Sequence, residues 1–378
     1  MDNKNRLVDL VKSLIRIDSQ NPPGREREIA VFVKDIFSKY PVKTRLIEFK
    51  PDRTNVIVFI KGHNSRASLL LTPHLDTVPI GRNWDFAPLG GKIHRGRIYG
   101  RGATDCKANI AVCIETLRKI LEKGIRFNYD IIFAATADEE TGSYYGLIPL
   151  LKKKVICPDF ALILDADDFN IIIAQKGLLH IKIGIIGKSA HGAYPDRGIN
   201  AIDYASEFIS QIKKIKFAYK KHRYLKPPTI NIGTIRGGDK VNMVADWCQV
   251  ECDIRYLPGM DSNVIIRTIK KMLGAIAKKY NFEIFATQAP YEAGLETNLV
   301  KSLRRASLET NGFCHFKGSE GATVMTFFQE YNIPCVATGF GSENNAHSTN
   351  ESVSIGNLKK GEEFLTNFLF NFNQEIHN

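Results

Sequence analysis

Three apolar runs that end in metal-binding residue types constrain this chain most. Each run is short, continuous and bounded by polar residues, which predicts a buried strand. The runs are residues 67–71, 131–135 and 161–164. Metal-binding side chains follow them in the same order: His74 and Asp76, then Asp138, Glu139 and Glu140, then Asp165. Ligands of an open α/β sheet gather at the carboxyl ends of its strands, so we expect these side chains to share one rim.

A glycine-rich turn over residues 100–105 adds Asp105 just before a helix predicted over 108–121. Neutral imidazole and carboxylate oxygen both bind zinc well, so His74 and these acids together suit a metal ion. Asp76, two residues after His74, can orient the ring from outside the metal shell. Taken alone, Asp105 could equally be a helix N-cap, and the His-x-Asp pair an ordinary hydrogen bond at a strand end.

The composition is that of a globular protein with room for two domains. The chain has 378 residues, 44% hydrophobic and 24% charged. It contains no run of about 18 apolar residues, so we expect no transmembrane helix. Its N-terminus has Asp and Asn at its start and an amphipathic rather than a continuous apolar stretch, so we do not expect a secretory signal. The seven cysteines are scattered without a CxxC pair, which argues against a disulfide framework or a cysteine zinc site. We therefore expect a cytoplasmic protein.

The net charge of +12 raises the question of a nucleic-acid or acidic partner. The lysines are spread over many predicted helices, and the whole chain is rich in Lys, Ile and Asn. The positive charge therefore indicates a general bias in composition and not a binding surface. No nucleic-acid-binding motif accompanies the charge. We expect no nucleic acid and no membrane among the partners.

The first part of the chain alternates helices with strands. Amphipathic patterns predict helices over 5–17 and 25–39, and the turn SQNPPG separates them because its prolines and glycine cannot continue a helix. Residues 55–60 and 67–72 are predicted as neighbouring strands. The α/β pattern resumes after Pro290. It then predicts a helix near 297–311, a turn GSEGAT, a helix into Tyr331, a strand IPCVATGFG and a last helix from about Asn357.

Residues 178–291 have a different element order, namely strand, helix, strand, strand, helix, strand. This is the split βαβ, ferredoxin-like order. We therefore predict an α/β protein. Its catalytic domain, residues 1–177 and 292–378, has a central mixed sheet flanked by helices, and a ferredoxin-like α+β lid or dimerisation domain, residues 178–291, is inserted in it.

Motifs spread over nearly the whole chain resemble one enzyme family. They are NPPG, HLDTVP, YGRGATDCK, DEETGS, AQKG, SAHGAYPDRGINAI, DIRYLPG and AHSTNE. Any one alone is weak, but together they are specific. The chain resembles the dinuclear zinc amidohydrolases that include aminoacylase, acetylornithine deacetylase, succinyl-diaminopimelate desuccinylase, carboxypeptidase G and several di- and tripeptidases.

The resemblance implies two zinc ions per subunit, with Co²⁺ or Mn²⁺ as alternatives. His74, Asp105 and Asp165 would hold one ion. Asp105, Glu140 and His347 would hold the other, so that Asp105 bridges the two. Two neighbouring metals can share a water, lower its pKa and polarise the scissile carbonyl.

The resemblance also assigns roles outside the metal shell. Glu139 would be the general acid and base, and Asp76 would orient His74. His191 would reach the active site of a partner subunit and stabilise the oxyanion, which implies a homodimer. A surface position or a helix-capping role would explain His191 more simply.

Asn242 and Arg255 match family positions that bind the carboxylate or carbonyl of the substrate. Arginine suits a carboxylate because its planar fork donates two parallel hydrogen bonds. An ion pair at a strand edge would explain Arg255 equally simply.

Two departures from the family pattern bear on the substrate. Asp165 lies in DAD, where the deacetylases usually have Glu in EPT, and Asp here is more typical of dipeptidases and aminopeptidases. GSEGATVM also lacks the Asp and Arg frequent in acyl-amino-acid deacylases. The leading prediction is zinc-dependent hydrolysis of the amide bond of an N-acyl amino acid, of the acetylornithine deacetylase and succinyl-diaminopimelate desuccinylase type. The alternative is a dipeptidase or aminopeptidase acting on short peptides. A non-catalytic binding protein is disfavoured because it would not need Glu139.

Overall fold

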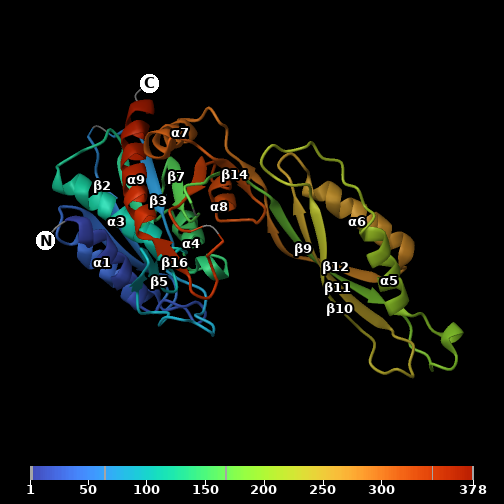
Figure 1. Ribbon diagram of the computed structural model, residues 1–378. Coiled ribbons are helices and arrows are strands. Elements are labelled where there is room, and N and C mark those ends of the chain that lie inside the picture. The colour runs from blue at the N-terminus through green and yellow to red at the C-terminus, as the bar shows by residue number, and fades with distance from the viewer. Residues whose placement is uncertain (1–2, 64, 167, 343, 377–378) are drawn as a thin grey trace. The chain divides into compact units, whose positions relative to one another are not determined.

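The computed structural model describes residues 3–63, 65–166, 168–342 and 344–376. Its contacts divide the chain into two compact units. Unit 1 consists of Met1–Ile173, Ala293–Lys317 and Phe327–Asn378, and unit 2 consists of Ala174–Glu292 and Gly318–Thr326. The mixed α/β architecture expected from the sequence is confirmed (Figure 1). The domain boundaries given above stay a prediction.

Unit 1 is built on a mixed sheet with the strand order β1-β2-β6-β3-β7-β15. The strands β6, β3, β7 and β15 are parallel, whereas β1 and β2 are antiparallel to their neighbours. Parallel strands covered on both faces have continuous apolar sequences, which explains why these runs could be recognised. The bounds are β1 Lys43–Glu48, β2 Thr54–Ile60, β3 Ser68–Thr72, β6 Asp130–Ala135, β7 Phe160–Leu164 and β15 Cys335–Thr338.

Helices flank this sheet. In Figure 1, α1, α3 and α9 form one layer on the near side of the sheet, and α1 and α9 both pack on α3. Phe364, Phe368 and Phe372 of α9 are fully buried there. The predicted helices are confirmed to within a few residues. The bounds are α1 Asn3–Arg16, α2 Glu26–Phe37, α3 Lys107–Glu122, α4 Leu147–Lys152, α7 Asn298–Asn311, α8 Met325–Gln329 and α9 Ile355–Glu375.

Several short strands were not expected from the sequence. A small sheet with the order β16-β5-β4 supports the glycine-rich turn, and β8 continues the main sheet by pairing Ile172 with Ala337. Strands of two to five residues carry too little periodicity to be recognised. The bounds are β4 Lys92–His94, β5 Arg97–Tyr99, β8 Ile171–Gln175, β13 Tyr291–Glu292, β14 Phe316–Ser319 and β16 Ser352–Ser354.

Unit 2 has the predicted strand, helix, strand, strand, helix, strand order. Its antiparallel sheet has the order β10-β11-β9-β12, and alternate residues of β9 and β11 form a core with α5 and α6. Asn200 and Asp261 cap the two helices, as their side chains accept N–H groups of the first turn. The bounds are β9 Gly177–Ile186, α5 Ala201–Ile212, β10 Thr229–Gly237, β11 Trp247–Tyr256, α6 Ser262–Ile276 and β12 Tyr280–Gln288.

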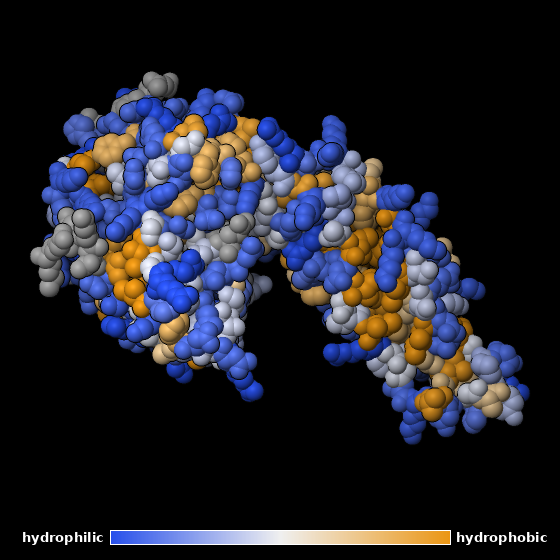
Figure 2. Space-filling view, in the orientation of Figure 1, coloured by the Kyte–Doolittle hydropathy of each residue, from blue (hydrophilic) through white to orange (hydrophobic). Residues whose placement is uncertain are grey.

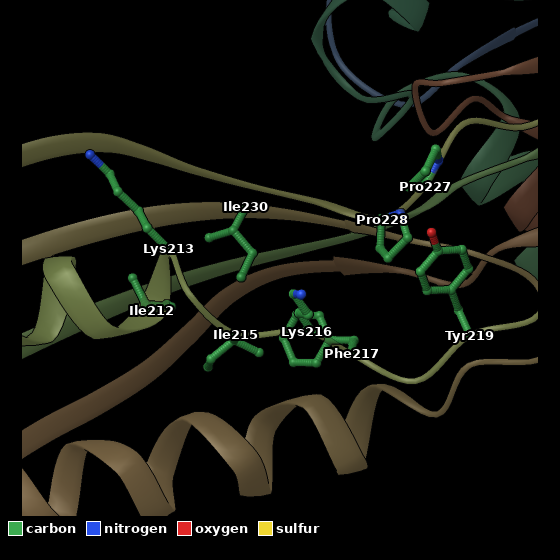
Figure 3. A pocket seen from close by; sticks show the side chains of 9 residues that line it. All are labelled: Ile212, Lys213, Ile215, Lys216, Phe217, Tyr219, Pro227, Pro228 and Ile230. Atoms are coloured by element: carbon green, nitrogen blue, oxygen red, sulfur yellow. The ribbon is translucent and has the colours of Figure 1, made fainter.

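The surface of unit 2 carries many apolar side chains on the face seen in Figure 2. A cleft of about 570 Å³ lies between the end of α5 and the start of β10. Its walls combine isoleucine, phenylalanine and proline with Lys213, Lys216 and Tyr219 (Figure 3). Among the helices that the structure describes, none is both long enough and apolar enough to span a membrane.

Candidate metal centre

The expected rim forms in unit 1 where β3, β6 and β7 end. His74 follows β3 by two residues, and Asp165 directly follows β7. After β6 the chain enters a single 3₁₀ turn, η1 Glu139–Thr141. These strands are parallel neighbours, so their carboxyl ends meet at one edge of the sheet. Asp105 and His347 reach the same rim from loops distant in the sequence.

The five predicted ligands fall into two overlapping groups. One contains His74, Asp105 and Asp165, and the other contains Asp105, Glu140 and His347. Within each group the candidate ligand atoms lie within 4.8 Å of one another.

Asp105 lies between two imidazole rings. Its Oδ1 is 2.7 Å from His74 Nε2, and its Oδ2 is 3.1 Å from His347 Nε2. Asp165 Oδ1 lies 3.5 Å from His74 Nε2, and Glu140 Oε2 lies 3.1 Å from His347 Nε2. Each oxygen of Asp105 therefore belongs to a different ligand group, as a bridging carboxylate requires.

Most of these spacings approach those between the ligands of one metal ion. Ligands about 2.0–2.2 Å from a tetrahedral zinc are separated from one another by roughly 3.3–3.6 Å. The 3.1 Å distances from His347 Nε2 to Asp105 and Glu140 and the 3.5 Å distance from His74 Nε2 to Asp165 are close to this range. The 2.7 Å between His74 Nε2 and Asp105 Oδ1 is a hydrogen-bond distance, and it would have to lengthen for both atoms to bind one ion. The donor set, imidazole nitrogen with carboxylate oxygen, also suits zinc, cobalt or manganese.

The orientation of the His74 ring is suited to metal binding. Its Nδ1 lies 2.9 Å from the backbone oxygen of Asp76, which accepts a hydrogen bond and so places the proton on Nδ1. Its Nε2 faces Asp165 and donates to Asp105 Oδ1 at 2.7 Å, so this is the nitrogen that would give up its proton to bind a metal. The carboxylate of Asp76 is farther from the ring, at 3.6 Å from Nδ1. The orientation expected from Asp76 thus comes mainly through its backbone.

Electrostatics at the rim favour a cation. Hydrogen bonds to Asp105 and Glu140 raise the pKa of His347 to about 10, so this ring acts as a cation when no metal is bound. Burial raises the pKa of Glu139 well above its ordinary value, and the charge of Asp165 adds to this effect. Acids packed this closely need a positive partner to remain ionised together.

Cys106 lies beside the first ligand group but is bound differently. Its Sγ accepts the N–H of His74 at 3.2 Å, and its thiol donates to the oxygen of His74. Burial raises the pKa of Cys106 to about 12, so it stays a thiol near neutral pH. Only the thiolate is a good metal ligand, so Cys106 connects the loop to the end of β3 instead. No pattern in the sequence pointed to this contact.

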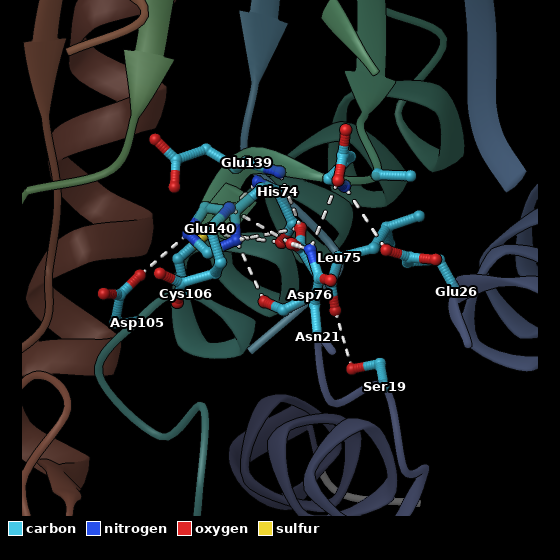
Figure 4. A network of polar contacts seen from close by, with 12 residues as sticks. Ser19, Asn21, Glu26, His74, Leu75, Asp76, Asp105, Cys106, Glu139 and Glu140 are labelled. Carbon is cyan, nitrogen blue, oxygen red and sulfur yellow. Dashed lines mark hydrogen bonds and ion pairs between the residues drawn. The ribbon is translucent and has the colours of Figure 1, made fainter. Parts of the chain in front are cut away.

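The carboxylate of Asp76 supports the turn after β6. Its Oδ1 and Oδ2 accept the backbone N–H groups of Glu139 and Glu140, each at 3.1 Å, and Oδ2 also accepts from Asn21 Nδ2 at 2.8 Å (Figure 4). Figure 4 shows the side chain of Glu139 pointing away from this network. The network therefore fixes the backbone of Glu139 and Glu140 while the carboxylate of Glu139 is directed elsewhere.

A buried ionic network behind the turn was missed by sequence reasoning. Arg53 bonds to Glu26 at 2.8 Å and to Asp138 at 2.7 Å, and all three side chains are at most 5% exposed. Asp138 also accepts from Asn21, at 3.4 Å. Asn21 lies in the motif NPPG and Asp138 begins the motif DEETGS, whereas Glu26 and Arg53 lie outside every recognised motif. No sequence pattern links these four positions.

The remaining predicted residues lie in unit 2. His191 and Asn242 are adjacent, since the N–H of Gly192 donates to Asn242 O at 2.8 Å. His191 is exposed, and its Nδ1 accepts the N–H of Ala193 at 3.1 Å. Arg255 forms a two-pronged ion pair with Asp253, at 2.8 and 3.1 Å. The guanidinium of Arg255 is thus bound to Asp253 of the same strand, β11.

The chain is similar to known proteins along most of its length. The family model described as "Peptidase family M20/M25/M40" matches residues 70–371. The acetylornithine deacetylase of Photorhabdus laumondii is 30% identical over 319 residues, which cover 80% of each chain.

Two solved structures share the fold. The aminopeptidase PepT from Bacillus cereus superposes with a TM-score of 0.83 at 23% identity and covers 98% of both chains. The YXEP protein of Bacillus subtilis, described as a dinuclear metal binding peptidase, has a TM-score of 0.76 at 16% identity and covers 97% of both chains.

Proposed function

The chain belongs to peptidase family M20/M25/M40, and on that premise we propose that it removes the acyl group from an N-acyl amino acid by hydrolysing the amide bond with two zinc ions. It is a metal-dependent hydrolase of amide or peptide bonds. The observation that carries the dinuclear site is the position of Asp105, whose two oxygens face His74 and His347.

The residues of the rim would divide metal binding and proton transfer between them. His74, Asp105 and Asp165 would hold one metal, and Asp105, Glu140 and His347 the other. Bound metals would supply Lewis acidity, which polarises a carbonyl and makes water more acidic. Glu139 would accept the proton of the attacking water and deliver it to the leaving amine. Its neighbour Glu140 points at His347, so the two adjacent acids can take separate tasks.

Three residues of unit 2 would act on the substrate. Arg255 would bind the substrate carboxylate. To do so, its guanidinium would have to bind Asp253 and the substrate together, or leave Asp253. Asn242 would hold a carbonyl or carboxylate oxygen. His191, which is exposed and adjacent to Asn242, would donate to the developing oxyanion in a partner subunit. This arrangement implies a homodimer in which unit 2 is both lid and dimerisation domain.

The acyl-amino-acid assignment is supported by the acetylornithine deacetylase relatives, which match along most of the chain. The alternative of a dipeptidase or aminopeptidase is favoured by one residue, Asp165, because aspartate here is more typical of the peptidases. We also propose the cytosol as the compartment, since the seven cysteines, all within the described residues, are free thiols.

A substrate panel tests the proposal. Protein reconstituted with Zn²⁺, Co²⁺ or Mn²⁺ is offered N-acetylated and N-succinylated amino acids beside unmodified di- and tripeptides. We expect turnover of acylated amino acids that is abolished by chelation and restored by metal. A parallel preparation of Glu139→Gln controls for contaminating hydrolases. Turnover of peptides alone would establish the alternative, and no turnover of either class by metal-loaded protein would overturn both.

A further inference from the structure

A carboxylate outside both ligand groups holds the loop that carries Asp105. Glu351 is fully buried. It accepts the backbone N–H groups of Thr104 at 2.7 Å and of Gly102 and Asp105 at 3.0 Å each. The turn around Asp105 lies outside helix and strand, so no ladder of backbone hydrogen bonds fixes it. The side chain of Glu351 takes the place of such a ladder.

The fourth donor to Glu351 is Arg101, whose Nη1 lies 2.8 Å from Oε2. With it the carboxylate has a donor for each of its roughly four lone-pair sites. Arg101 is 3% exposed, and its Nη1 also donates to the backbone oxygen of Ser348 at 3.1 Å. Ser348 directly follows His347. The Arg101–Glu351 pair therefore joins the segment that carries Asp105 to the segment that carries His347.

We propose that Glu351 is a positioning residue of the metal centre, and that with Arg101 it sets the spacing between Asp105 and His347. The inference rests on the proposed function, because it presumes that these two residues bind a shared metal ion. Removal of the carboxylate would leave buried N–H donors unpaired on the loop. The loop would then move to find other acceptors, and Asp105 would move with it.

A role in stability alone is the competing explanation, and the chain offers a matched control. Glu115 of α3 is also buried, at 1% exposed, and also pairs with an arginine, since Arg6 Nε donates to it at 2.7 Å. Neither residue belongs to the metal centre. Glu115→Gln therefore reports what the loss of a buried arginine–carboxylate pair does by itself.

The experiment titrates metal-free protein with Zn²⁺ against a competing chromophoric chelator. The chains compared are wild type, Glu351→Gln, Arg101→Lys and Glu115→Gln, each checked for folding by circular dichroism. Wild type should bind two ions, and Glu115→Gln should bind them with the same affinity as wild type. Glu351→Gln should bind about 10–100-fold more weakly, as expected for groups that support ligands from outside the metal shell. Arg101→Lys preserves the three backbone hydrogen bonds of Glu351, so its loss should lie at the lower end of that range.

Unchanged affinity in Glu351→Gln, or an equal loss in Glu115→Gln, would overturn the inference while leaving the proposed function intact. If Glu351→Gln does not fold without metal, the comparison is decided by Arg101→Lys, and wild-type affinity there overturns the inference. A wild-type protein that binds no metal would instead overturn the proposed function and this inference with it.

Discussion

The backbone N–H of Glu139 donates to the carboxylate of Asp76 at 3.1 Å. Asp76 was expected to act on His74, and its backbone oxygen does contact that ring. Its carboxylate instead holds the turn that presents Glu139, the predicted general base, and Glu140, a predicted ligand. One residue thus connects the end of β3 to the end of β6.

Asp76→Asn should disturb that connection. The asparagine keeps one acceptor oxygen and turns an NH₂ group toward a backbone N–H, so one of the two hydrogen bonds to the turn is lost. We expect metal affinity or turnover to fall by about 10–100-fold. Asp130→Asn is the control, because Asp130 also accepts a backbone N–H, from Gly62 at 3.0 Å, but away from the metal centre. Equal effects of the two variants on metal binding would contradict the assignment.

Glu139→Gln should separate chemistry from metal binding. The amide cannot accept the proton of water, so turnover should fall by about 10²–10⁴-fold while metal content stays at the wild-type value. Asp105→Ala should lose metal instead, because no carboxylate would remain between His74 and His347 to offset the repulsion of the two cations. Elemental analysis after gel filtration measures the metal. A fully active Glu139→Gln with normal metal content would rule out its role as the base.

Glu26 should make stability depend on pH. Burial, with the charge of Asp76, raises the pKa of Glu26 from 4.5 to about 7 in the folded protein. The folded state then binds more protons than the unfolded state between pH 4.5 and 7, so the free energy of unfolding falls as pH rises through this interval. Urea unfolding of wild type and Glu26→Gln at pH 5 to 8 should show wild type losing stability relative to the variant. If the difference in the free energy of unfolding between wild type and Glu26→Gln were the same at every pH, the raised pKa of Glu26 would be refuted.

Gly339→Ala should destabilise the rim. A Cβ at Gly339 would lie 1.8 Å from the backbone oxygen of Ala166, which directly follows the predicted ligand Asp165. The backbone must shift, and we expect a loss of about 1–3 kcal/mol in the free energy of unfolding together with weaker metal binding. Gly356→Ala is the control, since its nearest contact would be an ordinary 3.4 Å. Wild-type stability in Gly339→Ala would contradict the prediction, because it would show that the ends of β7 and β15 can move apart at little cost.

His191 should serve the active site of a partner subunit. His191→Ala and Glu139→Gln proteins, each of low activity alone, are mixed and allowed to exchange subunits. A shared site predicts recovered turnover, because a mixed dimer contains one site with both residues intact. Native mass spectrometry confirms the exchange. Confirmed exchange without recovery, or a monomer by light scattering, would place His191 in its own chain or outside the reaction.

The sequence by itself determined the strands that carry the predicted ligands, and most of the helices. An apolar run followed by an acid is a local pattern, and burial of a parallel strand on both faces makes it readable. The same locality explains why the order of elements in residues 178–291 was predictable. The ion pair of Arg255 with Asp253 was also within reach, because residues two apart on a strand share a face.

Only the tertiary structure decided which side chains meet. Arg53 and Asp138 are 85 residues apart, and Arg101 and Glu351 are 250 apart. No periodicity links such positions, because their hydrogen bonds depend on how loops close over the sheet rather than on neighbouring residues. The same holds for Asp105, which any helix start could explain until His74 and His347 were found on either side of it. The sequence supplied the candidate ligands, and the packing of distant loops brought their side chains together.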